Sequence, residues 1–242
     1  MKHTLGFDPR DIPWSVHDQN WPALPPTALH SEHLRWAFKN PPAWTPEVKR
    51  EPPIGQRAPQ AAAVLVPIVM RGEHGNEPHL LLTQRTQHLS SHAGQIAFPG
   101  GKVDPDDQSV EHAALREAEE EVGLTSEHIE VLGQLPSYIT GTSFHITPVV
   151  ALVSPDHTLR PNANEVEFAF EVPLSFLMDP SNHRLHHWEN NGVQRQWYSM
   201  PYRPATTHLP NASNPETEYF IWGATAGMIR NFYRFLLASN SL

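Results

Sequence analysis

Phe98-Pro99-Gly100-Gly101 leads through a polar loop into Arg116-Glu117-Ala118-Glu119-Glu120-Glu121-Val122-Gly123-Leu124. The second segment has a helix-forming composition and ends at a glycine, which is typical of a helix C-terminus. On a helix, Glu117, Glu120 and Glu121 share one face, because positions three and four apart are neighbours. Three carboxylates on one face predict a site for divalent cations. The alternative is a solvated acidic face.

Charge compensation separates these two interpretations. A solvated acidic face normally carries Lys or Arg three or four residues away. Here those positions are apolar or neutral, apart from Arg116, which lies four residues before Glu120. Exposed like charges at this spacing repel by about 0.2–0.5 kcal/mol per pair, and a bound cation reverses that repulsion. Because Mg²⁺ and Mn²⁺ prefer oxygen ligands, the spacing favours a Mg²⁺ or Mn²⁺ site.

The helix and the turn before it resemble the Nudix box of the Nudix hydrolases. That box is a glycine, five residues, Glu, seven residues, Arg-Glu, an apolar residue, any residue, Glu-Glu, any residue, Gly and an apolar residue. Gly101 and residues 116–124 fit it, although the loop is one residue longer and Asp107 or Gln108 stands where the first Glu belongs. The resemblance implies a pyrophosphatase, a hydrolase of acid anhydrides, that acts on a small nucleotide-derived substrate.

The residues before the box are similar to the signature of the coenzyme A pyrophosphatase branch, which also has the longer loop. The matching positions are Leu81, Leu82, Thr83, Arg85, Thr86, Gly94 and Phe98 to Gly101. Ser90 replaces the second Arg of the signature. The resemblance implies cleavage of coenzyme A or its thioesters to 3′,5′-ADP and 4′-phosphopantetheine products. It also implies that Arg85, His88 and His92 contact substrate phosphates.

The resemblance assigns roles to the helix residues. Glu117, Glu120 and Glu121 are implied to be the metal ligands, with the Gly101 carbonyl as a further one. Arg116 is expected to hold Glu120 or a neighbouring carboxylate in one rotamer. Glu119 lies nearly opposite Glu117 on the helical wheel, so we expect it in solvent.

The general base stays open between two residues. Some Nudix enzymes use a glutamate of the box and others a glutamate from a later loop. Glu120 is the first kind of candidate, and Glu165 in Asn164-Glu165-Val166 is the second. His145 is a weaker contender.

Two groups of histidines are not expected to bind a metal ion. His88 and His92 are four residues apart, but the chain lacks a His-Glu-x-x-His arrangement or a third ligand nearby, so zinc is disfavoured. His183, His186 and His187 flank a hairpin, and we expect them in solvent.

Composition excludes several classes of protein. The net charge of −9 argues against a nucleic-acid binder, and residues 101–130 alone carry a balance of −8. That acidic region repels an anionic pyrophosphate unless cations bridge the two. There is no cysteine, no apolar leader and no uninterrupted apolar run of about 18 residues, so we expect a cytoplasmic protein without disulfides or membrane spans.

The order of predicted elements indicates the fold class. Eleven of the 25 prolines lie in residues 1–60, which we interpret as a Pro-rich extension, with a helix near 28–39, packed on a domain at 61–242. Strands are predicted at 61–69, 79–85, 129–134, 146–153 and 166–173, helices at 109–122, 174–178 and 218–238, and a hairpin at 185–198 around Asn191-Gly192. This mixture predicts an α/β protein, an α/β/α sandwich around a mixed sheet. The Nudix resemblance implies the same fold for residues 61–242.

Three functions compete. The leading one is a coenzyme A pyrophosphohydrolase. The second is a Nudix hydrolase of another nucleoside diphosphate derivative, such as ADP-ribose or a dinucleotide. The third is a non-catalytic Nudix module that senses a nucleotide, and the complete set of Glu117, Glu120 and Glu121 argues against it. The oligomeric state does not follow from these features.

Overall fold

The main sheet of the protein has eight strands and mixed direction. The computed structural model describes residues 7–16, 20–54, 58–88, 93–190, 192–204 and 218–240. The strands are β2 (Gln60–Arg71), β3 (Glu77–Arg85), β4 (Ile96–Ala97), β5 (Gly100–Lys102), β6 (Ile129–Gln134), β7 (Tyr138–Ile139), β8 (Phe144–Val153) and β9 (Val166–Pro173). Their order is β4-β3-β2-β8-β6, with β5 paired to β2, β7 to β8 and β9 to β3. The β2–β8 pair is parallel and the β2–β3 pair antiparallel, as the mixed sheet requires.

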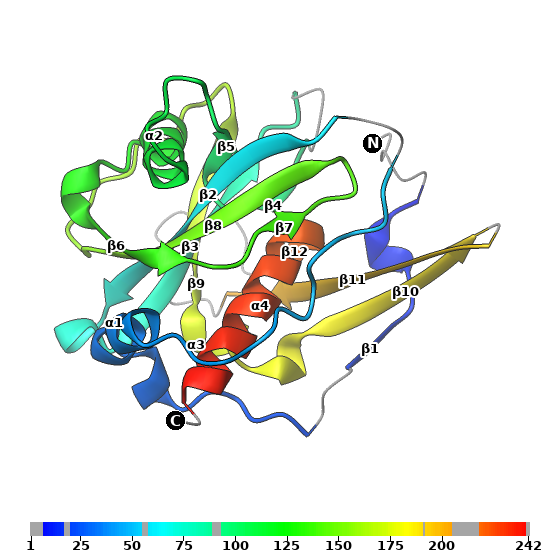
Figure 1. The fold of residues 1–242 in the computed structure, drawn as a ribbon, viewed down its shortest axis with the longest axis horizontal. Coiled ribbons are helices and arrows are strands. Elements are labelled where there is room, and N and C mark those ends of the chain that lie inside the picture. The colour runs from blue at the N-terminus through cyan, green and yellow to red at the C-terminus, as the bar shows by residue number, and fades with distance from the viewer. Residues whose placement is uncertain are drawn as a thin grey trace.

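Helices cover both faces of this sheet (Figure 1). Helix α2 (Val110–Val122) packs its small residues Ala113, Ala114 and Ala118 against the sheet in one core, which we call the α2-side core. Helices α1 (Ser31–Lys39) and α4 (Gly223–Ser239) contribute to the core on the other face. The short helix α3 (Leu174–Leu177) follows β9. The predicted α/β/α sandwich around a mixed sheet is therefore confirmed.

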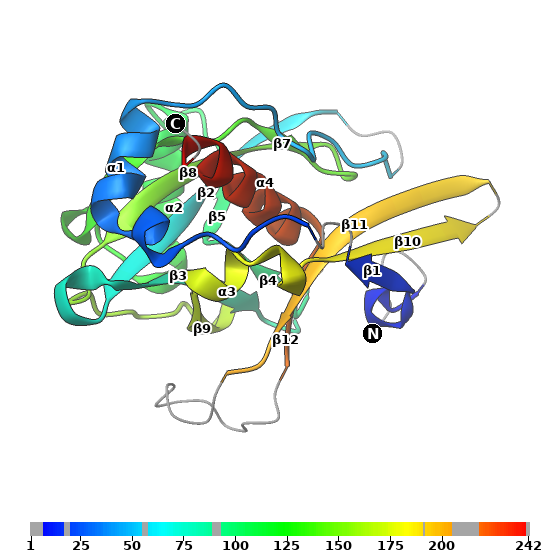
Figure 2. The ribbon, with the colours of Figure 1, turned by 90° about the horizontal axis from the view of Figure 1, so that it is seen from below.

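A second sheet was not predicted. It is antiparallel and has the order β1-β10-β11-β12, with β1 (Trp14–Val16), β10 (Arg184–Asn190), β11 (Val193–Tyr202) and β12 (Tyr219–Trp222). The predicted hairpin is its centre, since Asn190 pairs with Val193 and Gly192 has a φ of 76°. Asn191 lies outside the described residues. Figure 2 shows this hairpin projecting away from the main sheet.

The last helix begins later than predicted, at residue 223 instead of 218. Residues 219–222 are the strand β12, and α4 begins at Gly223, which has a φ of 63°. The run Tyr-Phe-Ile-Trp is aromatic and β-branched, which suits a strand. Helix α1 also begins later than predicted, at Ser31, after a 3₁₀ turn at Pro26–Leu29. None of the helices in the described ranges has the length and apolar composition needed to span a bilayer.

The N-terminal segment contacts the rest of the fold through a polar cluster on α4. Arg230 is 1% exposed and its Nε lies 3.0 Å from Glu47 Oε2, while Tyr198 donates its hydroxyl hydrogen to Glu47. Asn231 binds both backbone groups of Val48, at 3.1 Å to the N–H and 2.7 Å to the carbonyl. Residues around 47–48 are therefore fixed to the last helix.

Two hairpin histidines are buried, so the prediction that they lie in solvent was wrong. His183 donates to the Leu177 carbonyl at 2.8 Å and accepts from Arg230 at 3.1 Å, and burial lowers its pKa to about 4. His186 is also 1% exposed; it bonds the Ile12 carbonyl and the Ser199 hydroxyl. Polar partners from distant segments make both burials possible. His187 is exposed, as predicted.

Candidate active site

Helix α2 is capped at both ends, which fixes where its carboxylates point. Ser109 accepts the His112 N–H at 3.1 Å at the N-terminus. Gly123 adopts the left-handed conformation with a φ of 69°, and its N–H bonds the Glu119 carbonyl at 2.9 Å. The helix therefore ends directly after Glu121 and Val122, and the chain turns away.

Glu117 lies against the glycine turn. A methyl group placed on Gly101 would sit 2.4 Å from the Glu117 carboxyl carbon, closer than van der Waals contact permits. Gly101 pairs with Ala63 on β2, so the turn cannot move away without breaking the sheet. Any side chain at position 101 would therefore displace this carboxylate from the place that it occupies against the turn.

Glu121 is the most buried of the three helix carboxylates. Its side chain is 3% exposed, its Oε2 accepts the Gly100 N–H at 3.1 Å, and its Oε1 accepts from Arg85 at 3.2 Å. Arg85, which lies 36 residues earlier at the end of β3, was expected to contact substrate phosphates. Its ion pair with Glu121 was not predicted, because spacing along the helix does not reveal partners from other strands. Strand pairing brings this cation to the site.

Arg116 is held by Asp107 and holds two glutamates. Its Nε and Nη2 donate to Asp107 at 3.1 and 3.0 Å, and its Nη1 lies 3.0 Å from Glu117 Oε1 and 3.2 Å from Glu120 Oε2. Asp107 also accepts from His112 at 2.9 Å and from the Asp104 N–H at 2.8 Å. The Arg116 guanidinium holds the pKa of Asp107 well below its usual range, so this carboxyl is ionised.

Electrostatic repulsion acts among the carboxylates. Burial raises the pKa of Glu121 to about 7 against the opposing effects of Arg85 and the Gly100 N–H, and the charges of Glu117 and Glu165 raise it further. Burial likewise raises the pKa of Glu117; Arg116 opposes this, and Glu120 and Glu165 add to it. Each anion is thus disfavoured by its neighbours, which is the condition that a bound cation relieves.

Glu165 comes to the helix carboxylates from a distant loop. Its N–H donates to the Asn162 carbonyl at 2.9 Å, and the Asn162 N–H donates to the Glu121 carbonyl at 2.9 Å. Its own carbonyl accepts the Thr86 N–H at 3.0 Å. These bonds fix the loop between the end of β3 and the C-terminus of α2.

The remaining predicted residues are less constrained. Glu120 has a side chain that is 59% exposed, and Glu119 and His88 are exposed. His145 is half-buried on β8. His92 and Ser90 lie outside the described residues.

The donor set fits a hard cation. Glu117, Glu120, Glu121 and Glu165 supply oxygen donors, as Mg²⁺ or Mn²⁺ requires. Within the ranges that the structure describes, no three acidic or histidine side chains already converge tightly enough to surround an ion. Arg116 contacts one oxygen each of Glu117 and Glu120, and Arg85 contacts one oxygen of Glu121, so Glu117 and Glu120 each keep an oxygen that Arg116 does not occupy.

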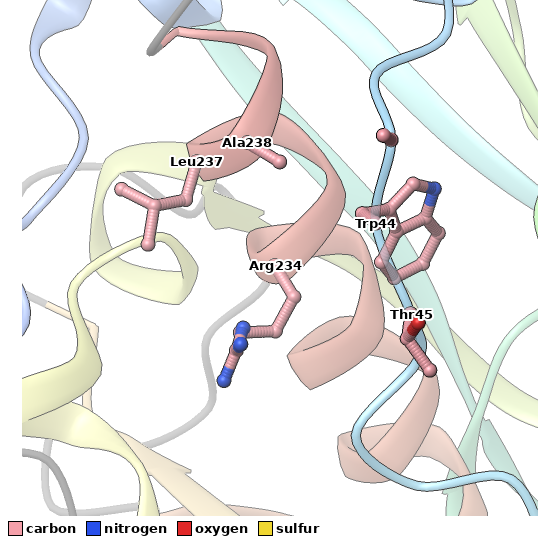
Figure 3. A pocket seen from close by; sticks show the side chains of 6 residues that line it. Trp44, Thr45, Arg234, Leu237 and Ala238 are labelled. Carbon is pink, nitrogen blue, oxygen red and sulfur yellow. The ribbon is translucent and has the colours of Figure 1, made fainter.

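A cavity of ≈ 280 Å³ lies apart from these residues. It is lined by Ala43, Trp44, Thr45, Arg234, Leu237 and Ala238, between the N-terminal segment and α4 (Figure 3). The Arg234 guanidinium is turned away from Trp44 and contacts Glu47 at 3.0 Å. The cavity contains no carboxylate and does not belong to the site on α2.

Comparison with known proteins identifies the family. A family model described as the NUDIX domain matches residues 59–199. The chain belongs to the Nudix family. A protein named Uncharacterized Nudix hydrolase NudL from Shigella flexneri serotype 5b is 42% identical over 186 residues, which cover 76% of this chain and 85% of that protein. The protein of the same name from Escherichia coli O1:K1 is 44% identical over 170 residues, or 70% and 79% of the two chains.

A solved Nudix structure is also similar. RenU, a Nudix hydrolase from M. smegmatis, has a TM-score of 0.40 and 26% identity, with 48% of this chain and 71% of that chain covered. As a Nudix hydrolase, the protein acts on pyrophosphate bonds of small nucleotide-derived substrates. Members of this family generally use a divalent metal ion such as Mg²⁺ or Mn²⁺.

Proposed function

We propose that this Nudix hydrolase cleaves the phosphoanhydride of coenzyme A or its thioesters, giving 3′,5′-ADP and 4′-phosphopantetheine products. One observation carries the proposal. The strand with the coenzyme A-type signature, β3, ends in Arg85 directly beside Glu121 and the loop of Glu165. This contact supports a single site that combines Arg85 of the signature with the carboxylates proposed for hydrolysis.

Glu117, Glu120 and Glu121 are the proposed ligands of Mg²⁺ or Mn²⁺, together with the Gly101 carbonyl. When bound, such an ion neutralises phosphate oxygens and lowers the pKa of a coordinated water. Arg116 is the proposed positioning residue, because Asp107 fixes its guanidinium on two sides while it contacts Glu117 and Glu120. Ligands held in one rotamer need less reorganisation when the substrate binds.

Glu165 is the proposed general base. Its charge acts on both Glu117 and Glu121, and backbone bonds fix its loop. Glu120 is the competing base, but a carboxylate that coordinates a metal ion is the weaker base of the two. His145 stays the weaker contender. The base accepts a proton from the attacking water as the water oxygen bonds to phosphorus and the anhydride oxygen leaves.

Arg85, His88 and His92 are the proposed contacts of substrate phosphates. Arg85 pairs with Glu121 in this structure, so it reaches a phosphate by exchanging or sharing that partner. The competing substrate class is another nucleoside diphosphate derivative, such as ADP-ribose or a dinucleotide. A non-catalytic sensor is disfavoured, since a binding module has no need of the full carboxylate set with its associated Glu165.

A hydrolysis screen tests the proposal. Coenzyme A, dephospho-coenzyme A, ADP-ribose and NADH are incubated with Mg²⁺ or Mn²⁺, and products are identified by mass spectrometry. We expect 3′,5′-ADP and 4′-phosphopantetheine from coenzyme A, and no turnover after EDTA treatment. Efficient cleavage of ADP-ribose with coenzyme A left intact would replace the proposed substrate with the competing class.

A further inference from the structure

Among the described residues, a strip of the main sheet beside the carboxylates is only partly covered. Strands β2 and β8 continue past α2 towards the loop that joins β7 and β8 (Figure 1). On this extension, Ala61 pairs with His145, His145 with Ile139, and Ala63 with Thr147. Paired residues point to the same face, and Ala63 belongs to the α2-side core, so these side chains face the side on which α2 lies.

Six residues define this strip. They are Val103 after β5, Ala61 on β2, His145 and Thr147 on β8, and Ser137 and Ile139 around β7. Ala61 and Ser137 are exposed and the other four are half-buried. The Val103 N–H bonds the Ala61 carbonyl at 3.1 Å, so the strip is continuous from β5 to β7.

The strip begins at the proposed metal ligands. Gly101, which lies against the Glu117 carboxyl group, pairs with Ala63, and Ala63 pairs with Thr147. Neighbouring strands are about 4.8 Å apart, so Thr147 lies roughly 10 Å from Gly101 across two strand spacings. Ala63 is itself buried in the α2-side core, so a chain that leaves a diphosphate at Glu117 reaches the strip over Val103, two residues after Gly101.

The chemistry of the strip differs from that on the other side of the carboxylates. None of its six residues is Asp, Glu, Lys or Arg. Ala61 gives it a low apolar floor, the Ser137 and Thr147 hydroxyls lie 3.2 Å apart, and His145 shares the face of β8 with Thr147. Such a surface recognises an uncharged chain with hydrogen-bonding groups, whereas Arg85 on β3 is suited to phosphate.

We propose that this strip binds the non-nucleotide half of the substrate, an uncharged chain that carries amide groups. This inference rests on the proposed function and adds an orientation to it. The nucleotide half lies towards Arg85, and the other half crosses β2 and β8. The small side chain of Ala61 leaves space for this chain. His145 and the two hydroxyl groups form hydrogen bonds with its amide groups.

Product inhibition of coenzyme A hydrolysis tests each half separately. The inhibitors are 4′-phosphopantetheine and 3′,5′-ADP, and the variants are Ala61→Phe and His145→Ala. Gln60→Phe is the matched control, because Gln60 is the adjacent exposed residue and points to the opposite face of β2. Hydrolysis is followed with Mg²⁺ present, and the inhibition constant of each product is measured.

Ala61→Phe should raise the inhibition constant of 4′-phosphopantetheine at least about tenfold, since a ring fills the space of the chain. His145→Ala should raise it about threefold to tenfold through a lost hydrogen bond. Both variants should leave the inhibition constant of 3′,5′-ADP unchanged. Gln60→Phe should leave the inhibition constants of both products unchanged. The inference is overturned if 4′-phosphopantetheine inhibits both site variants as strongly as it inhibits the wild type. It is also overturned if the inhibition constant of 3′,5′-ADP is the one that rises. If the wild type leaves coenzyme A intact, the proposed function fails and the orientation fails with it.

Discussion

Substituting Gly101 with Ala should separate the geometry of the site from the stability of the fold. The added methyl group would stand 2.4 Å from the Glu117 carboxyl group, while ordinary contacts begin near 3.4 Å. Glu117 must therefore shift by about 1 Å, and a misplacement of that size can lower a rate by roughly 10²-fold. The backbone at Gly101 does not use the left-handed region, so Ala fits it. Reduced freedom of the unfolded chain should then raise stability by about 0.4–1 kcal/mol.

The assay combines steady-state kinetics on the substrate found in the screen with thermal unfolding. We expect kcat to fall by about 10²-fold while the melting temperature stays level or rises. Lys102→Ala is the control, because Lys102 is exposed on the same strand. Glu117→Asp should cost much less in the Gly101→Ala background than alone, since both changes displace one carboxylate. A Gly101→Ala enzyme with a wild-type kcat would refute the role of the Gly101–Glu117 contact.

Three further outcomes follow from the site and the buried histidine. Glu165→Gln should lower kcat by about 10²-fold or more and remove the acidic limb of the pH–rate profile, with KM nearly unchanged; a loss under about threefold would return the base to Glu120. The kcat/KM for coenzyme A should be about tenfold higher than that for dephospho-coenzyme A if a cationic side chain binds the 3′-phosphate, and equal values would contradict such a contact. The neutral form of His183 is favoured in the fold, so stability should fall by about 3 kcal/mol as pH drops from 6.5 to about 4. Denaturant titrations should show a flatter pH dependence for His183→Asn, and an unchanged slope would contradict the assignment.

Features encoded by local spacing could be predicted from the sequence. The i, i+3, i+4 spacing of Glu117, Glu120 and Glu121 and the stop at Gly123 fix a helix and its face without reference to the rest of the chain. The Asn191-Gly192 pair predicted the hairpin, because two-residue hairpin turns accept few residue types. These predictions depend on contacts within a few residues.

Features that depend on strand order could not be predicted. Arg85 reaches Glu121 because β3 pairs with β2 and so ends beside β5 and α2. The strand β12 was taken for the start of a helix because its partner β11 is set by the fold and not by the neighbouring sequence. The burial of His183 likewise depends on Arg230, which lies 47 residues later. A polar residue near a turn gives no local sign that distant partners will satisfy its hydrogen bonds.

The departure of the loop from the general Nudix pattern has a physical explanation. The loop is one residue longer than that pattern, and an Asp stands about where a Glu belongs. Asp has one methylene fewer than Glu, so its carboxylate reaches less far from the backbone. The extra residue lets the loop fold back, with the Asp107 N–H bonded to the Asp104 carbonyl at 3.0 Å, and Asp107 then meets two nitrogens of Arg116. Gln108 is exposed and Asp107 is the residue that contacts the helix, so the longer loop and the shorter side chain compensate each other and leave Arg116 fixed beside Glu117.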